Sequence, residues 1–193
     1  MNWITKVTPP GLKTMLAKKD TPDDLWVKCP LSGELVYKTD LEENWHVTPA
    51  GAHLRISPRT RLRLLFDDER WEPLALPSVP HDPLKFKDDK PYPSRLKAAK
   101  AKIAARDKKE SENGGAPIIQ EDCMVAAYGK IGGVPTVVLV QDFAFMGGSL
   151  GMAAGEGFVA AAQMALARKA GFVVCTASGG ARMQEGTLSL MQM

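Results

Sequence analysis

One short stretch of this sequence, Ser-Gly-Gly-Ala at 178–181, has the residue types of a site that binds negative charge. It follows an apolar run at 172–176 that predicts a buried strand, and it precedes a helix predicted from Arg182 onward. Glycines at the end of a strand let backbone N–H groups turn outward, and a helix N-terminus adds a positive dipole. The stretch therefore predicts a site for a phosphate, a carboxylate or a developing oxyanion. A tight strand-to-helix turn without any ligand fits the same four residues equally well.

A second glycine-rich stretch, residues 147–151, precedes another predicted helix and repeats the pattern. Two such loops at the carboxyl ends of neighbouring strands would open on one crevice, which favours a functional site over a plain turn. Neither loop has the Gly-Lys-Ser/Thr ending of a phosphate loop, so a nucleoside-triphosphate hydrolase is not expected. The histidines (His46, His53 and His81) lie far from both loops in the sequence, and no nucleophile–base set stands out. Catalysis here would rest largely on backbone dipoles.

The elements that must position these loops are predicted to form a layered α/β or α+β core over residues 116–193. Runs at 123–128 and 134–140 are apolar enough for strands buried on both faces. A helix is predicted to run to Lys169, with Gly171 as its C-terminal glycine. The last apolar residues lie inside an amphipathic helix without a stop signal, so we expect a core that is incomplete at the C-terminus of the chain.

The residues before this core are more polar, with 21 Lys and Arg and 17 Asp and Glu in positions 1–115. We predict three segments there: a flexible arm at 1–24, a small antiparallel β ribbon at 25–57, and a helical and extended connector at 58–115. Within the connector, Ser57 is expected to cap a helix that starts at Pro58.

The whole chain has 193 residues and a formal net charge of +3, too small to imply nucleic-acid binding on its own. No apolar run approaches the roughly 20 residues that span a bilayer, so a membrane protein is not expected. The first residues lack the pattern of a secretory signal, and three cysteines is a low, odd number. A reducing, cytoplasmic location is therefore expected.

Several stretches, in their order along the chain, resemble the β subunit of bacterial acetyl-CoA carboxylase carboxyltransferase. The resemblance extends from about Leu25 to the end of the sequence and keeps the motif order of that family. The stretches that carry it are residues 25–30, residues 82–86, Tyr92, Arg95, Leu96, residues 143–149, residues 176–185 and residues 189–193.

This resemblance implies a crotonase-like fold preceded by a small ribbon, and a place in an α2β2 assembly with an α subunit. Together with biotin carboxylase and the biotin carboxyl carrier protein, that assembly carboxylates acetyl-CoA to malonyl-CoA for fatty-acid synthesis. Carboxybiotin on the carrier would supply the carboxyl group. The resemblance further implies that the backbone N–H groups of Gly179 and Gly180 form an oxyanion hole, for the acyl-CoA enolate or for the biotin oxygen. Residues expected at the substrate are Gly147, Gly148, Ser178, Ala181 and Arg182.

The ribbon departs from the resembled family, which commonly binds zinc through two C-x-x-C pairs. Cys29 is present, but its partner position is Ser32, and the second pair falls at Thr48 in a segment one residue short. Serine and threonine are poor zinc ligands beside thiolate. Cys29, His46 and His53 would supply only three ligands at unfamiliar spacing. Zinc is therefore not expected, and the ribbon is predicted to be free of metal.

Three alternatives stay open at the level of sequence. Arg182 is placed to meet an anionic substrate, but an intramolecular salt bridge accounts for it equally well. The basic helix predicted from Ser94 to about Lys109 either receives the phosphates of CoA or is a solvated face. The chain as a whole is either the carboxyltransferase subunit, a subunit of another biotin-dependent acyl-CoA carboxyltransferase or decarboxylase, or a nucleic-acid-binding module without catalysis.

Overall fold

The protein was analysed as a computed structural model that describes residues 25–112 and 116–192. The arm predicted for residues 1–24 and the helix break predicted at 113–115 lie outside the described residues. Two compact units are present, one ending at Arg55 and the other starting at Ile56. In the described ranges, every helix is too short or too polar to cross a membrane.

The first unit contains a two-stranded antiparallel ribbon. Strands β1 (Trp26–Lys28) and β2 (Leu35–Tyr37) pair with Trp26 opposite Tyr37, and these two rings lie 5.3 Å apart between centroids. The ribbon was predicted to extend to residue 57, but helix α2 (Lys38–Glu43) follows β2 directly. The antiparallel pairing was thus predicted correctly, whereas α2 was missed.

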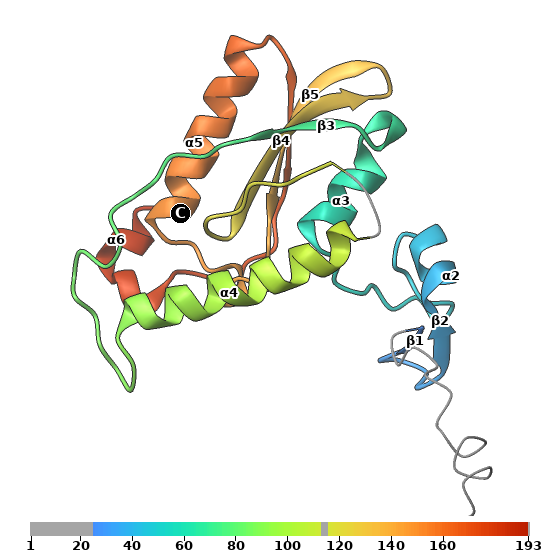
Figure 1. The fold of residues 1–193 in the computed structure, drawn as a ribbon, viewed down its shortest axis with the longest axis horizontal. Helices are drawn as coiled ribbons and strands as arrows, with labels where there is room; N and C mark the ends of the chain where they lie inside the picture. Colours follow the sequence, from blue (N-terminus) through green and yellow to red (C-terminus); the bar gives the residue numbers. More distant parts are fainter. Residues whose placement is uncertain (1–24, 113–115, 193) are drawn as a thin grey trace, which may run out of the picture. The chain divides into compact units, whose positions relative to one another are not determined.

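The second unit is a mixed sheet with helices on both faces, as Figure 1 shows. Strand order is β3-β4-β5-β6; the first two pairings are antiparallel, and β5 and β6 are parallel. This confirms the predicted α+β class. The elements are α3 (Pro58–Leu65), η2 (Asp67–Glu69), β3 (Trp71–Leu74), α4 (Tyr92–Ser111), β4 (Met124–Ile131), β5 (Val134–Gln141), η3 (Met146–Gly148), α5 (Met152–Ala167), β6 (Gly171–Cys175), η4 (Met183–Glu185) and α6 (Thr187–Leu190).

The two central strands are buried on both faces, as their apolar runs predicted. On β4, Ala126 belongs to the cluster that includes α4 and α5, while its neighbours Val125 and Ala127 belong to the cluster that includes α3. Alternation along β5 is the same, with Val137 on one side and Val138 on the other. Side chains of successive strand residues point to opposite faces, so one apolar run supplies two cores.

Strand β3 was not predicted, because Pro73 lies within it and the surrounding segment is rich in proline. Proline lacks the N–H that a central strand must donate, but an edge strand tolerates it. Strand β3 is the edge of this sheet and pairs only with β4.

The ends of two helices test the local predictions. The Ser57 side chain accepts the backbone N–H of Thr60 at the start of α3, which confirms the predicted cap. At the end of α5, Lys169 takes the left-handed conformation with φ of 50°, and Gly171 is instead the first residue of β6. The predicted glycine terminator was therefore wrong.

Candidate functional site

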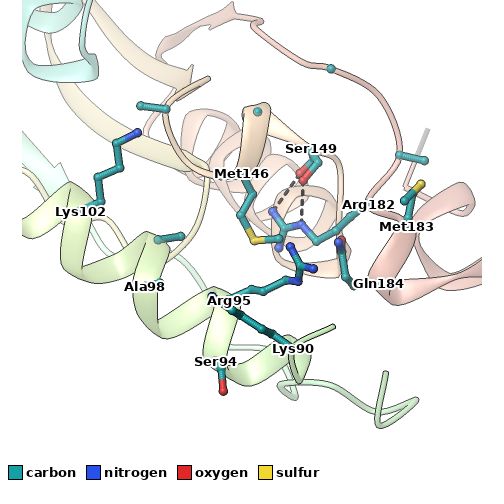
Figure 2. A pocket seen from close by; sticks show the side chains of 15 residues that line it. Lys90, Ser94, Arg95, Ala98, Lys102, Met146, Ser149, Arg182, Met183 and Gln184 are labelled. Atoms are coloured by element: carbon teal, nitrogen blue, oxygen red, sulfur yellow. Dashed lines mark hydrogen bonds between the residues drawn. The ribbon is translucent and has the colours of Figure 1, made fainter. Parts of the chain in front are cut away.

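A cleft of about 890 Å³ lies between helix α4 and the two glycine loops. Figure 2 shows Lys90, Arg95 and Lys102 on one side of it, from α4 and the residue run just before α4. On the other side lie Gly147 of the first loop and Gly179 of the second, together with η4. The sequence predicted that both loops would meet at one crevice, and the structure brings them together.

The two loops are in direct backbone contact. Gly179 N–H donates to Gly147 O at 2.9 Å, and Leu150 N–H donates to Gly180 O at 2.9 Å. A Cβ on Gly148 would overlap the carbonyl oxygen of Ala177, so only glycine permits this approach. The loops therefore form one rigid wall of the cleft.

The backbone donors predicted as an oxyanion hole are already engaged within the chain. Gly179 N–H bonds Gly147 O, and Gly180 N–H donates to Ser178 Oγ at 3.0 Å. By contrast, within the described residues the N–H groups of Gly147 and Ala181 have no acceptor, and both residues line the cleft. Gly179 also lines the cleft, whereas Gly148, Ser178 and Gly180 are not among the residues that line it.

Neither glycine loop presents a free helix N-terminus. The helix predicted from Arg182 is instead the short η4, which Gly186 (φ 54°) separates from the four-residue α6. At the start of α5, the N–H of Met152 donates to Glu185 Oε2 at 2.6 Å, so a carboxylate already caps that helix. A helix follows the first loop as predicted, but its N-terminus already holds a carboxylate, and only a short 3₁₀ helix follows the second loop. Attraction for an anion in the cleft must therefore come from loop N–H groups and cations.

Arg182 borders the cleft, but its guanidinium is committed to other residues of the chain. It is 1% exposed. Its five N–H donors are matched by five hydrogen bonds: two to Asp122, two to Ser149 and one to Tyr92 Oη. Burial opposes its charge, yet the hydrogen bonds and charge of Asp122 outweigh burial and raise the pKa of Arg182 above its usual range. Of the two roles considered for Arg182, the structure shows the salt bridge, and no donor is left for a substrate.

Two of the four cationic residues that line the cleft, Arg95 and Lys102, lie on α4. Arg95 is paired with Asp88 at 2.6 Å. Within the described part of the chain, Lys102 has no ion-pair partner and is exposed. Lys97, five residues earlier on the same helix, does not line the cleft. The face of α4 that carries Lys102 is thus a positively charged edge open to an anionic ligand.

The ribbon offers a poor set of zinc ligands. Cys29 Sγ lies 3.2 Å from Thr48 Oγ1, and Ser32 N–H donates to the same sulfur at 3.5 Å. Hydrogen bonds from Ser32 and Thr48 lower the pKa of Cys29 to about 7. Among the described residues there is no group of three or more His, Cys, Asp or Glu that could hold a metal. One thiol among hydroxyls does not fit a structural zinc site.

Comparison with known proteins gives a family match over part of the chain and relatives over all of it. Residues 101–193 match the carboxyl transferase domain family. The chain is 83% identical, over all its residues, to the acetyl-coenzyme A carboxylase carboxyl transferase subunit beta of Hyphomonas neptunium, and covers 59% of that protein. It is 58% identical to the protein of the same name from Hirschia baltica, covering 51% of it. The chain thus spans between half and three-fifths of the length of these two relatives.

Among solved structures, the chain resembles transcarboxylase 12S crystallised with methylmalonyl-coenzyme A and methylmalonic acid. The match has a TM-score of 0.50 and 27% identity, and it covers 72% of this chain and 22% of the other. This similarity agrees with the crotonase-like fold that the sequence led us to expect.

Proposed function

This chain belongs to the family of acetyl-CoA carboxylase carboxyl transferase β subunits, and from that premise we propose that its cleft is part of the carboxyl transfer site. The reaction moves a carboxyl group from carboxybiotin, held on a separate carrier protein, to acetyl-CoA and forms malonyl-CoA. One observation carries the proposal: two glycine loops with backbone N–H groups face the positively charged edge of α4 across a single cleft.

The proposed chemistry needs little from side chains. Carboxybiotin breaks its N–C bond to release CO2, and the resulting ureido anion takes a proton from the methyl group of acetyl-CoA. The enolate carbon then attacks CO2 to form the new C–C bond of malonyl-CoA. The negative charge that develops on the thioester oxygen requires preorganised N–H donors, which is what loop backbones supply.

The predicted oxyanion hole at Gly179 and Gly180 remains a proposal, with a condition attached. Since Gly180 N–H is bonded to the Ser178 hydroxyl, that hydroxyl must turn away before the N–H holds a substrate oxygen. Gly147 and Ala181 offer N–H groups at the same cleft without such an exchange. The Gly179 N–H would likewise have to release Gly147 O, which it bonds at 2.9 Å. We propose that these four backbone groups share in holding the enolate oxygen and the neighbouring acyl-CoA.

The proposed partners follow from the family. A carboxyl transferase α subunit would complete an α2β2 assembly, and the biotin carrier protein and biotin carboxylase would supply carboxybiotin. We propose a cytoplasmic location as well, which fits the low, odd number of cysteines in the sequence.

The test is the reverse reaction, malonyl-CoA-dependent carboxylation of biocytin. This chain, and a version extended to the length of its relatives, would each be assayed with and without the α subunit. We expect activity that requires both subunits and that prefers malonyl-CoA over methylmalonyl-CoA. Preference for methylmalonyl-CoA would point to a different acyl-CoA carboxyltransferase, and inactivity of every mixture would overturn the proposal.

Lys102 provides a more specific prediction about how the substrate binds. If α4 receives the phosphates of CoA, Lys102→Ala should raise KM for malonyl-CoA about fivefold at low salt, with less effect at high salt. Lys97→Ala is the matched control, because it removes the same charge from the same helix outside the cleft. A substrate lacking the 3′-phosphate of CoA should reduce the difference between wild type and Lys102→Ala. Equal KM values for both lysine variants would contradict the assignment.

A further inference from the structure

A buried polar cluster, made of Arg182, Asp122, Tyr92 and Glu185, lies behind the two glycine loops. Arg182 and Tyr92 are each 1% exposed, and Glu185 is 4% exposed. The Tyr92 hydroxyl accepts from Arg182 Nη1 at 3.2 Å and donates to Glu185 Oε1 at 2.6 Å. Burial and the hydrogen bond to Glu185 raise the pKa of Tyr92 well above its usual range, so the hydroxyl keeps its proton and its role as donor.

The polar cluster ties four separate parts of the chain to one another. Tyr92 is the first residue of α4, and Asp122 lies just before β4. Arg182 reaches the first loop through Ser149, bonding its carbonyl at 2.9 Å and its hydroxyl at 3.0 Å. Glu185, from η4 beyond the second loop, caps α5 at Met152. Each glycine loop is therefore held at its far end by this cluster.

One glycine in the first loop makes room for the cluster. A Cβ on Gly151 would lie 2.7 Å from Glu185 Oε1 and 2.8 Å from Oε2, too close for any side chain. Glycine at position 151 thus leaves room for the Glu185 carboxylate to reach the start of α5. The relative position of the two loops explains why a glycine is needed there.

Stability alone is a weak reason for such a cluster. Taking an arginine and two carboxylates out of water is expensive, and apolar residues of the same volume are often as stable or more so. Fully satisfied polar networks do, however, fix one geometry, because every displaced member leaves another without a partner. Every donor of Arg182 and both oxygens of Glu185 are used here.

We propose that Tyr92 and Glu185 are positioning residues, which hold the two glycine loops at the spacing that carboxyl transfer requires. The expected effect on carboxyl transfer rests on the proposed function, whereas the role of the two residues in holding the loops does not. Neither side chain lines the cleft, so both act through the loop backbones that do.

The test is Tyr92→Phe, which removes one oxygen and leaves Glu185 and Arg182 each short of one partner. In the enzyme extended to the length of its relatives and assembled with the α subunit, we expect kcat to fall about tenfold. KM for malonyl-CoA should stay within about twofold, because the groups that contact substrate are all retained. Glu185→Gln should act in the same direction, since its amide cannot accept from both Tyr92 and Met152. Tyr128→Phe is the matched control: Tyr128 is partly buried, and its ring lies against Arg168.

Amide hydrogen exchange gives a readout that does not depend on the reaction. In Tyr92→Phe, residues 146–151 and 177–182 should exchange about tenfold faster, while β4 and β5 exchange as in wild type. Unchanged exchange in both loops, or faster exchange throughout the sheet, would overturn the proposal. If the wild-type enzyme transfers no carboxyl group, the proposed function fails, and the exchange result still decides whether these residues hold the loops.

Discussion

Gly148→Ala is expected to reduce kcat/KM of carboxyl transfer about a hundredfold, since a shift of about 1 Å between catalytic groups costs that much. The added Cβ would overlap the Ala177 carbonyl oxygen and lie 3.1 Å from its carbon. The two loops have no easy way to separate, because the Gln141 side chain clasps them. Its Nε2 donates to Gly148 O at 2.7 Å, and its Oε1 accepts from Ala177 N–H at 3.2 Å. Relief of the overlap therefore moves the loop wall of the cleft.

The matched control is Gly133→Ala, at the β4–β5 turn. Gly133 also has positive φ, 80° against 63° for Gly148, but an added Cβ there meets nothing within 4 Å. Gly133→Ala should lower the free energy of unfolding only by the backbone strain, about 1–2 kcal/mol, and should leave the kinetics unchanged. Gly148→Ala should lose about 1–3 kcal/mol more from overpacking. Urea unfolding and reverse-reaction kinetics measure both. Equal activity of the two variants would show that the loop contact does not shape the site.

The parts of the fold that sequence predicted well are those set by local pattern. Strands β4 and β5 consist mostly of apolar residues, as burial on two faces favours. The Ser57 cap is equally local, since its acceptor and donor are three residues apart. Strand β3 was not predicted, because a proline is tolerated in it only at the edge of the sheet. No local sequence pattern reveals that position.

In the candidate site, too, some features were predictable from the sequence and others were not. The sequence predicted the two glycine loops and their meeting, because both were placed at the carboxyl ends of neighbouring strands. What occupies the start of α5 was not predictable, since Glu185 lies 33 residues from the Met152 N–H that it accepts. Asp122 is 60 residues from Arg182, so sequence left substrate contact and salt bridge as equal alternatives. Polar partners that are brought together only by the completed fold carry no signal in sequence spacing.

The polar cluster also leads to the largest expected loss of stability. Arg182→Met keeps much of the volume but removes the cation. It leaves unmatched negative charge on the buried Glu185 and on Asp122, whose side chain is 14% exposed. Removing one partner of a buried pair costs about 3–5 kcal/mol, because the remaining charge stays out of water. We expect a loss of that size in the free energy of unfolding, measured by urea denaturation of the second unit's transition.

Arg168→Met is the matched control, because it breaks another arginine–carboxylate pair with two hydrogen bonds. Arg168 bonds both oxygens of Glu72, at 2.7 and 2.9 Å, but the two side chains are 34% and 55% exposed. Water solvates the Glu72 carboxylate when its partner is removed, so the loss should stay within about 1 kcal/mol. Both arginines bond two oxygens of a carboxylate. A larger loss of unfolding free energy in Arg182→Met than in Arg168→Met would therefore be due to burial and not to the number of hydrogen bonds. If Arg182→Met costs no more than Arg168→Met, the polar cluster is not closed to water, and its role in holding the glycine loops falls with it.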